Sequence, residues 1–172
     1  MNFGMCFDRL ISHEGGFSDD RNDPGNWTGG RVGVGLLKGT KFGIAANTYG
    51  DIDIKNLTLE EAKSLYYRDW WLKCGADQLD GAIVFQMWDF AVNAGMSTAK
   101  RALQRVARVA DDGQIGPLTI RAVRAMSTSD VIMRYNAQRL RYYTSLSTFG
   151  TFGKGWVNRV AGQLEYGAED SE

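Results

Sequence analysis

The segment His13-Glu14-Gly15-Gly16-Phe17 places a carboxyl group, two glycines and an aromatic ring at the end of an apolar stretch. A glutamate held between apolar helix packing and a close-approach loop can keep its proton near neutral pH, because burial disfavours the charged form. A carboxyl group in that state can act as a general acid. Glu14 is therefore the first candidate catalytic residue. The alternative is an ordinary helix-end carboxylate paired with Arg9 or another surface cation.

Glycoside hydrolysis needs two carboxyl groups: one protonates the leaving oxygen, and the other activates water or stabilises the oxocarbenium-like transition state. Asp19, Asp20 and Asp23 all follow Glu14 on the next loop. Asp23 stands in the most rigid surroundings of the three, because Pro24 fixes the turn that it begins. We predict Asp23 as the second catalytic residue, and a simple turn-forming role is the alternative.

Metal, thiol and nucleotide chemistry receive little support from the sequence. The chain has one histidine, and Phe17 stands where a zinc-binding helix would carry its second one. Cys6 and His13 are two helical turns apart, roughly 10 Å, which is beyond hydrogen-bond reach. The glycines of residues 29–39 lack the Gly-Lys-Ser/Thr ending of a phosphate-binding loop. We expect no metal and no cofactor.

The elements that must position these residues are mostly helices. Apolar residues at helical spacing predict a helix over residues 2–13 that ends at Gly15 and Gly16. Thr58-Leu59-Glu60-Glu61 is a capping box, and it predicts a helix that stops at Gly75. Further helices are expected over residues 83–95, 97–110, 117–126, 129–144 and 155–167. The first of these should be central and buried, because it is apolar on most sides.

Residues 18–56 are rich in Gly, Asp and Asn and predict a long irregular loop. A small β-hairpin is expected inside its 29–39 segment, at residues 31–37. The predicted fold class is therefore all-α, a bundle of six or seven helices. The length of 172 residues fits one compact domain.

Composition restricts the classes of function. Lys+Arg and Asp+Glu both number 20, so no overall charge attracts nucleic acid. Two cysteines are too few for a disulfide scaffold, and the sequence leaves open whether Cys6 and Cys74 meet. No stretch approaches the roughly 20 apolar residues of a membrane span, and residues 1–10 lack the pattern of a secretory signal. If the protein works outside the cytosol, another factor must release it.

Basic residues concentrate in the second half of the chain. The ordinary interpretation is a solvated helix face, and the other is a surface for an anionic polymer such as the cell wall. The residues concerned are Lys100, Arg101, Arg105, Arg108, Arg121, Arg124, Arg134, Arg139 and Arg141.

Four blocks follow one another along the chain: His13-Glu14-Gly15-Gly16-Phe17, Asn22-Asp23-Pro24-Gly25, Thr40-Lys41-Phe42-Gly43-Ile44 and Asp89-Phe90-Ala91-Val92-Asn93-Ala94-Gly95. In this order they resemble the signature of glycoside hydrolase family 108, the N-acetylmuramidases of phages and bacteria. The resemblance implies a lysozyme-like helical fold, Glu14 as the catalytic acid, and cleavage of the β-1,4 bond between N-acetylmuramic acid and N-acetylglucosamine. We expect a catalytic part over residues 1–75 and a helical part over residues 78–167.

The resemblance also suggests a third catalytic residue. Eight residues separate Glu14 from Asp23, the interval of the Glu/Asp/Thr catalytic set in phage lysozymes. Thr40 occupies the place of the family's threonine, where it would position a water, and Thr28 is a rival for that role. Residues 26–39 are an insertion relative to typical members, and could act as a lid or displace the threonine.

Substrate binding is expected from aromatic and amide side chains. Phe17, Phe42 and Tyr49 fall on the loop side and could stack against sugar rings, whereas the helical tryptophans are expected in the core. Asn93 lies one turn after Asp89, so it either reaches the cleft or caps the turn at Gly95.

The second half resembles the family's wall-binding segment, through Leu103-Gln104-Arg105 and the Asp-Gly-x-x-Gly-x-x-Thr pattern that begins at Asp112. The function expected from the whole chain is that of a phage endolysin or a close bacterial relative. We expect a monomer that is made in the host cytoplasm, is released by a holin-type partner and acts on glycan strands of periplasmic peptidoglycan. The alternatives are a lytic transglycosylase acting on the same bond and a non-catalytic peptidoglycan-binding protein.

Overall fold

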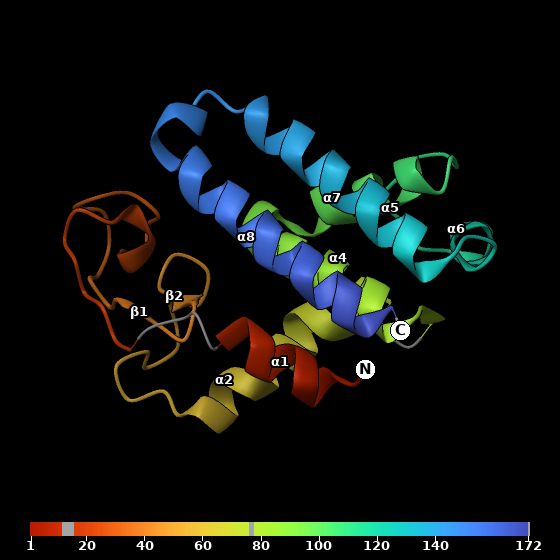
Figure 1. Ribbon diagram of the computed structural model, residues 1–172. Coiled ribbons are helices and arrows are strands. Elements are labelled where there is room, and N and C mark those ends of the chain that lie inside the picture. The colour runs from red at the N-terminus through yellow and green to blue at the C-terminus, as the bar shows by residue number, and fades with distance from the viewer. Residues whose placement is uncertain (12–15, 76–77, 172) are drawn as a thin grey trace. The chain divides into compact units, whose positions relative to one another are not determined.

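The computed structural model describes residues 1–11, 16–75 and 78–171. The chain divides into two compact units, a first unit of Asn2–Arg68 and a second unit of Asp69–Glu172 together with Met1. Helices dominate, and one two-stranded antiparallel sheet accompanies them (Figure 1). The prediction of an all-α fold with a small hairpin is confirmed. The expectation of a single domain with parts at residues 1–75 and 78–167 stays a prediction.

Two short helices provide the core of the first unit. Helix α1 (Phe3–Ile11) buries Cys6, Phe7 and Leu10 on one face. Helix α2 (Leu59–Tyr66) starts at the predicted capping box, in which the Thr58 hydroxyl accepts from the Glu61 N–H and the Glu61 carboxylate accepts from the Thr58 N–H. The rings of Phe7 and Tyr66 meet edge to face at 5.8 Å between centroids, which joins α1 to α2.

The hairpin lies after the segment in which the sequence placed it. Strands β1 (Thr40–Lys41) and β2 (Ile44–Ala45) pair antiparallel around Phe42 and Gly43. Both turn residues have positive φ, 52° and 72°, as a two-residue type I′ turn requires. Residues 31–37 form no strand, because left-handed glycines at positions 33 and 35 interrupt the extended backbone.

The second unit begins in a helix that changes its winding. A π-helical turn (Tyr67–Trp71) follows α2 across the boundary and continues into α3 (Leu72–Cys74). Gly75 ends this helix in the left-handed conformation with a φ of 73°, as the sequence predicts. Trp71, buried in this segment, packs edge to face against Trp88 at 5.5 Å between centroids.

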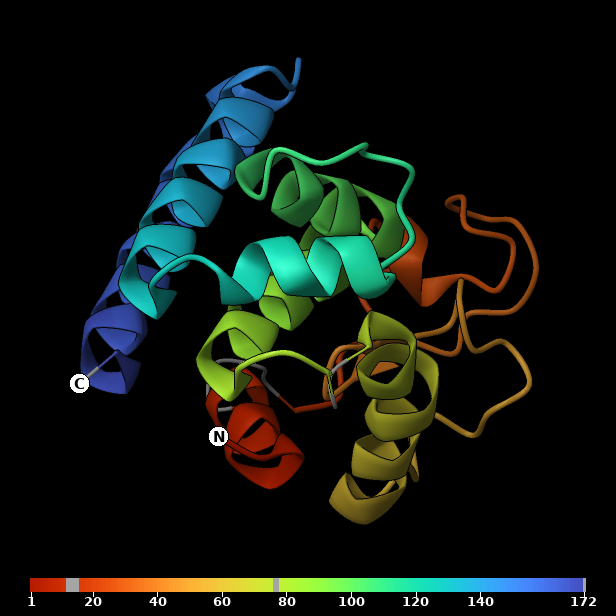
Figure 2. The same cartoon turned by 90° about the vertical axis from the view of Figure 1, so that its right-hand side faces the viewer.

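Five further helices complete the second unit: α4 (Gly81–Ala94), α5 (Met96–Val106), α6 (Pro117–Arg124), α7 (Thr128–Thr144) and α8 (Phe149–Asp170). Helix α4 is buried from Ala82 to Ala91, as expected for a central helix, and contacts α5, α7 and α8. Helices α7 and α8 run side by side (Figures 1 and 2). Within the described residues, no helix is long and apolar enough to cross a membrane.

Helix α8 begins six residues earlier than the sequence suggests. The glycines at positions 150, 153 and 155 favour a break, but tertiary packing supports the helix through them. Gly153 is buried, and a β-carbon there would lie 2.8 Å from the ring of Phe149. Phe149 also approaches Trp156, with ring centroids 6.4 Å apart. Trp156 in turn stacks on Tyr143 of α7 at 5.0 Å.

Candidate active site

The predicted general acid, Glu14, lies outside the described residues. The described chain resumes at Gly16, two residues further on. Ser18 pairs with Thr40 in an isolated antiparallel bridge, in which each N–H donates to the other carbonyl at 2.9 and 2.8 Å. The chain that leaves the Glu14 segment is thus held against the first residue of β1.

A buried amide, Asn26, organises the loop between Ser18 and Thr40. Its side chain is fully buried; Nδ2 donates to the Asp20 carbonyl at 2.9 Å, and Oδ1 accepts from the Thr40 hydroxyl at 2.7 Å. Its backbone carbonyl accepts from the N–H groups of Lys38 and Gly39. Asn26 therefore connects the aspartate-rich loop to β1. Sequence reasoning missed it, because asparagines in a loop ordinarily indicate turns.

Asp23 caps the short 3-10 helix Pro24–Asn26, and its Oδ1 accepts from the Gly25 N–H at 2.8 Å. The rigid turn predicted for Asp23-Pro24-Gly25 is confirmed. The side chain is exposed, and no described residue donates to its Oδ2. One carboxylate oxygen thus holds the backbone while the other remains available to water or a ligand. The catalytic role of Asp23 stays a prediction.

The two candidate threonines have different surroundings. Thr40 is half-buried and gives its hydroxyl proton to Asn26, so its oxygen can still accept a hydrogen bond from a water. The hydroxyl of Thr28 accepts from the Leu36 N–H at 2.9 Å, and the Thr28 N–H donates to the Leu36 carbonyl. Thr28 therefore closes the inserted loop. The catalytic roles of Thr40 and Thr28 stay predictions.

The inserted loop presents apolar side chains to solvent. Val32, Val34 and Leu36 are each about half exposed or more. Backbone hydrogen bonds close the loop beneath them, from Gly29 to Val34 and from Val34 to Arg31. The expectation that this segment acts as a lid stays a prediction.

Phe17 lines a polar pocket in the first unit. The pocket has a volume of about 420 Å³ and mixes carboxylates, ammonium groups and apolar side chains. Gly39 allows Phe17 to lie there, because a β-carbon on Gly39 would come within 2.6 Å of the Phe17 ring. The remaining lining residues are Asp19, Leu37, Lys38, Asp51, Asp53, Ile54 and Lys55. A pocket of this composition can accept hydroxyl and amide groups beside an aromatic ring.

Two charged groups of this pocket, those of Lys38 and Asp53, are held in place by hydrogen bonds. Lys38 donates to the Gly50 carbonyl, which fixes its ammonium group. The side-chain amide of Asn56 donates to Asp53 at 2.9 Å and, with the Asn56 N–H, lowers the pKa of Asp53. Asp53 therefore stays ionised to lower pH than an ordinary aspartate.

The other predicted aromatic residues lie outside this lining. Phe42 stands in the hairpin turn, with the Lys41 ammonium 5.4 Å from its ring centroid and the Tyr66 hydroxyl bound to its carbonyl. Tyr49 is half-buried, and its N–H donates to the Ala45 carbonyl. The structure does not bring Phe42 or Tyr49 into the pocket that Phe17 lines. Their role in sugar binding stays a prediction.

Asn93 belongs to the second unit and lies at the exposed end of α4. Its Oδ1 accepts from the Tyr143 hydroxyl at 2.6 Å. The turn at Gly95 is closed by the backbone, since the Gly95 N–H donates to the Ala91 carbonyl. Asn93 thus anchors α7 to α4 through Tyr143. Substrate contact by Asn93 stays a prediction.

One turn before Asn93, a buried carboxylate carries two guanidinium partners. Asp89 is 2% exposed and contacts Arg139 of α7 and Arg159 of α8, each at 2.7 Å. Burial alone raises the pKa of Asp89, but the two arginines outweigh this effect and hold the pKa below its ordinary value. Sequence reasoning missed this cluster. The sequence signal that could have revealed it is Asp89 itself, an acidic residue in an otherwise mostly apolar helix.

A second buried amide, Gln104, holds the turn that resembles the wall-binding pattern. Its Nε2 donates to Asp112 at 2.7 Å and to the Gln114 carbonyl at 2.9 Å, and its Oε1 accepts from the Gly113 N–H at 2.8 Å. The hydrogen bond from Gln104 is the main cause that lowers the pKa of Asp112. Two separated sequence blocks therefore form one hydrogen-bonded structure.

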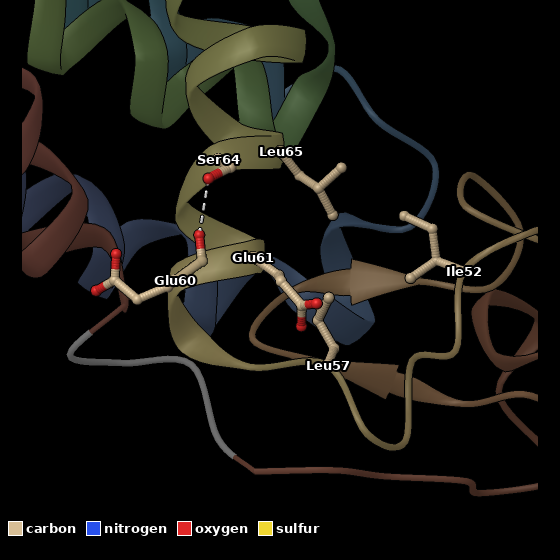
Figure 3. Close-up of a pocket in the computed structure, with 6 residues that line it drawn as sticks. All are labelled: Ile52, Leu57, Glu60, Glu61, Ser64 and Leu65. Carbon is tan, nitrogen blue, oxygen red and sulfur yellow. Dashed lines mark hydrogen bonds between the residues drawn. The ribbon is translucent and has the colours of Figure 1, made fainter.

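A further pocket lies beside α2, with a volume of about 480 Å³ (Figure 3). Its lining is apolar apart from a few polar groups, and Glu61 in it is committed to the capping box. The lining residues are Ile52, Leu57, Glu60, Glu61, Ser64 and Leu65, none of which was predicted as a site residue.

Thiol and metal chemistry find no site in the described part of the chain. Both cysteines are buried and reduced, and burial raises the pKa of Cys74 to about 12, which disfavours its reactive thiolate. Among residues 1–11, 16–75 and 78–171, no group of three or more His, Cys, Asp or Glu side chains is placed to hold a metal ion.

Comparison with known proteins identifies two regions. Residues 7–95 match the family described as Glycosyl hydrolase 108, and residues 98–161 match a family described as Predicted Peptidoglycan domain. A solved structure of Brucella abortus SagA is similar, with 31% sequence identity and a TM-score of 0.84. The similarity covers 99% of this chain and 95% of that one. Comparison with curated proteins gave no match.

Proposed function

Because the chain belongs to the glycosyl hydrolase 108 family and carries a peptidoglycan-type domain after it, we propose that it hydrolyses the β-1,4 bond between N-acetylmuramic acid and N-acetylglucosamine. The two matched families together support a glycoside hydrolase that acts on peptidoglycan. The observation that carries the proposed mechanism is the set of hydrogen bonds around Asn26, called the Asn26 frame below. This frame ties the Asp23 loop and Thr40 to the chain that leaves Glu14.

In the proposed mechanism, Glu14 protonates the glycosidic oxygen as the bond to the leaving sugar breaks. Asp23 then activates a water or stabilises the positive charge that develops on the sugar ring. The exposed Oδ2 of Asp23 is suited to either task, because Oδ1 is already bound to the Gly25 N–H. Thr40 places the water, which donates to the hydroxyl oxygen that Asn26 leaves available. Each of these roles is a proposal.

The polar pocket at Phe17 supports a sugar as the ligand. Sugar rings present apolar faces that stack on aromatic rings, and their hydroxyl and acetamido groups need hydrogen-bond partners. Phe17 supplies the ring, and the carboxylates and ammonium groups of the lining supply the partners. We propose that one residue of the glycan strand lies in this pocket, with Phe42, Tyr49 and Asn93 as further candidate contacts.

The biological setting is also a proposal. We propose a phage endolysin or a close bacterial relative that acts as a monomer. It would be made in the host cytoplasm, pass the membrane with the help of a holin-type partner and lyse the cell from within by cutting periplasmic peptidoglycan.

Digestion of purified peptidoglycan sacculi tests the reaction directly. We expect soluble fragments with N-acetylmuramic acid at the reducing end, identified by mass spectrometry after borohydride reduction. Fragments with 1,6-anhydro-muramic acid would show a lytic transglycosylase, and N-acetylglucosamine reducing ends would show cleavage of the other bond. Binding without release of any fragment would overturn catalysis and leave a peptidoglycan-binding protein.

The Asn26 frame makes a separate prediction. Replacing Asn26 with Ala removes the hydrogen bonds to the Asp20 carbonyl and the Thr40 hydroxyl in a fully buried position. We expect the free energy of unfolding to fall by about 1–3 kcal/mol in urea denaturation, with a lower rate of sacculus digestion.

The matched control is Asn22→Ala, because Asn22 lies on the same loop but is exposed. Its loss should change the free energy of unfolding by less than about 0.5 kcal/mol. Equal effects of the two substitutions would contradict the role assigned to Asn26.

A further inference from the structure

A basic groove runs along α6 in the second unit. Helix α6 is the blue-green helix that faces the viewer in Figure 2. The groove has a volume of about 500 Å³ and an apolar floor formed by Pro117, Ile120 and Ala125. The polar lining consists of Gln78, Arg121 and Arg124. None of these six residues is acidic or aromatic.

The arginines of this groove differ from several other cations of the same half, although the exposed Arg141 resembles them in having no ion pair within the described residues. Several members of the basic excess are neutralised by carboxylates, as in the pairs Arg105–Asp111 and Arg134–Asp130 and in the buried Arg139. Among the described residues, Arg121 and Arg124 form no ion pair. Arg124 donates to the Gln78 carbonyl at 3.0 Å, which holds its guanidinium at the groove. Within the described residues, the groove therefore combines two neighbouring guanidinium groups that no carboxylate neutralises.

The spacing of the two arginines directs both to one ligand. Residues three apart on a helix lie on the same face, so Arg121 and Arg124 are neighbours along the groove. A guanidinium offers two parallel N–H donors that match the two oxygens of a carboxylate. The apolar floor beside them suits small aliphatic groups. Among the described residues no aromatic ring lines the groove, so they offer no surface on which a sugar would stack.

From this chemistry we propose that the α6 groove binds a carboxylate of the peptidoglycan stem peptide, with an alanine methyl group on the apolar floor. The inference rests on the proposed function, because peptidoglycan attaches short carboxylate-bearing peptides to its glycan strands. Residues 117–125 of the groove also lie within the region that matches the Predicted Peptidoglycan domain.

Co-sedimentation with sacculi tests this proposal. The full chain carrying Glu14→Gln is mixed with purified sacculi, and with sacculi whose carboxyl groups have been converted to amides by a carbodiimide and ammonia. We expect amidation to weaken binding. We also expect Arg121→Gln, in the same background, to weaken binding to untreated sacculi about tenfold, the scale of one charge-assisted hydrogen-bonded contact.

Arg141→Gln is the matched control, because Arg141 is an exposed arginine of α7 outside the groove and its loss changes net charge equally. It should bind sacculi as the parent chain does. Far-UV circular dichroism and the midpoint of thermal unfolding should be the same for both variants, since Arg121 is exposed.

Three results would overturn the stem-peptide assignment: equal binding by the Arg121 and Arg141 variants, undiminished binding to amidated sacculi, or displacement by inorganic phosphate at constant ionic strength. The last would indicate a general anion site. Release of reducing ends from peptide-free glycan strands by the unmodified chain tests the proposed function separately. If the strands are cut while these binding results fail, only the groove assignment is wrong.

Discussion

Replacing Glu14 with Gln is expected to lower peptidoglycan cleavage by at least about two orders of magnitude, the usual contribution of a general acid. Glutamine has nearly the same size and can form hydrogen bonds, but it cannot give a proton to the glycosidic oxygen. We therefore expect the variant to fold normally. The measurements are release of reducing ends from sacculi and the fall in turbidity of chloroform-treated Gram-negative cells.

Glu60→Gln provides the matched control for this experiment. Glu60 is an exposed glutamate of α2, and the hydrogen bond at this residue involves its backbone carbonyl rather than its side chain. Its substitution should leave both the rate and the thermal midpoint unchanged. A Glu14→Gln variant that still cleaves at the unmodified rate would refute Glu14 as the acid, whatever its stability.

The largest expected effect on stability comes from Asp89. Arg139 is fully buried, and in the described part of the chain its Nε and Nη1 have no hydrogen-bond acceptor, so Asp89 is its main compensation. Asp89→Asn would leave a buried guanidinium without its counter-charge. We expect the free energy of unfolding to fall by about 3–5 kcal/mol, measured by urea denaturation at pH 7.

The control for Asp89 is Arg159→Gln. The Arg159 side chain is 25% exposed, so water can replace part of what it loses, whereas Asp89 retains Arg139 at 2.7 Å. This substitution should lower the free energy of unfolding clearly less than Asp89→Asn does. If both substitutions lower the free energy of unfolding equally, the buried ion pair between Asp89 and Arg139 is not the source of the stability.

The same carboxylate predicts how stability depends on pH. Because the pKa of Asp89 is lower in the folded protein than its ordinary value of 3.8, folding favours the ionised form. Its contribution is complete well above 3.8 and is lost as the pH falls through the lower folded pKa. We therefore expect the stability difference between the unmodified chain and Asp89→Asn to be constant near neutral pH and to shrink in acid.

The ion cluster also gives a structural role to a sequence block that resembles the family signature. Asp89 begins the block that ends at Gly95, and Asn93 belongs to the same block. Asp89 binds arginines of α7 and α8, and Asn93 binds Tyr143 of α7. These polar residues of α4 therefore assemble the helical unit. Any contact between Asn93 and the glycan would come in addition to this structural role.

Features that depend on neighbouring residues could be predicted from the sequence. Thr58 and Glu61 satisfy each other's backbone N–H groups, so their spacing alone predicts where α2 begins. The turn that starts at Asp23 and the helix end at Gly75 are local in the same way. The apolar character of residues 81–94 predicts a buried helix, because such a surface has to leave water wherever the helix packs.

Features that depend on distant residues could not be predicted in this way. Gly33 and Gly35 adopt left-handed conformations in a closed loop, so the predicted hairpin does not form there. The two strands instead pair within residues 40–45. Helix α8 continues through its glycines, and its Trp156 stacks on Tyr143 of α7, a contact between two helices. The intrinsic preference of glycine is weak, about 1 kcal/mol per residue, so tertiary contacts can override it.

For the site, the sequence by itself determined the family blocks, the candidate acid Glu14 and the turn that presents Asp23. Only the tertiary structure decided that Asn26 joins Asp20 to Thr40, that Thr28 closes a loop, and that Asp89 meets two arginines. The physical reason is distance along the chain. A cap or turn is made within a few residues, whereas the partners of Asp89 are 50 and 70 positions away, and only the packing of helices brings them together.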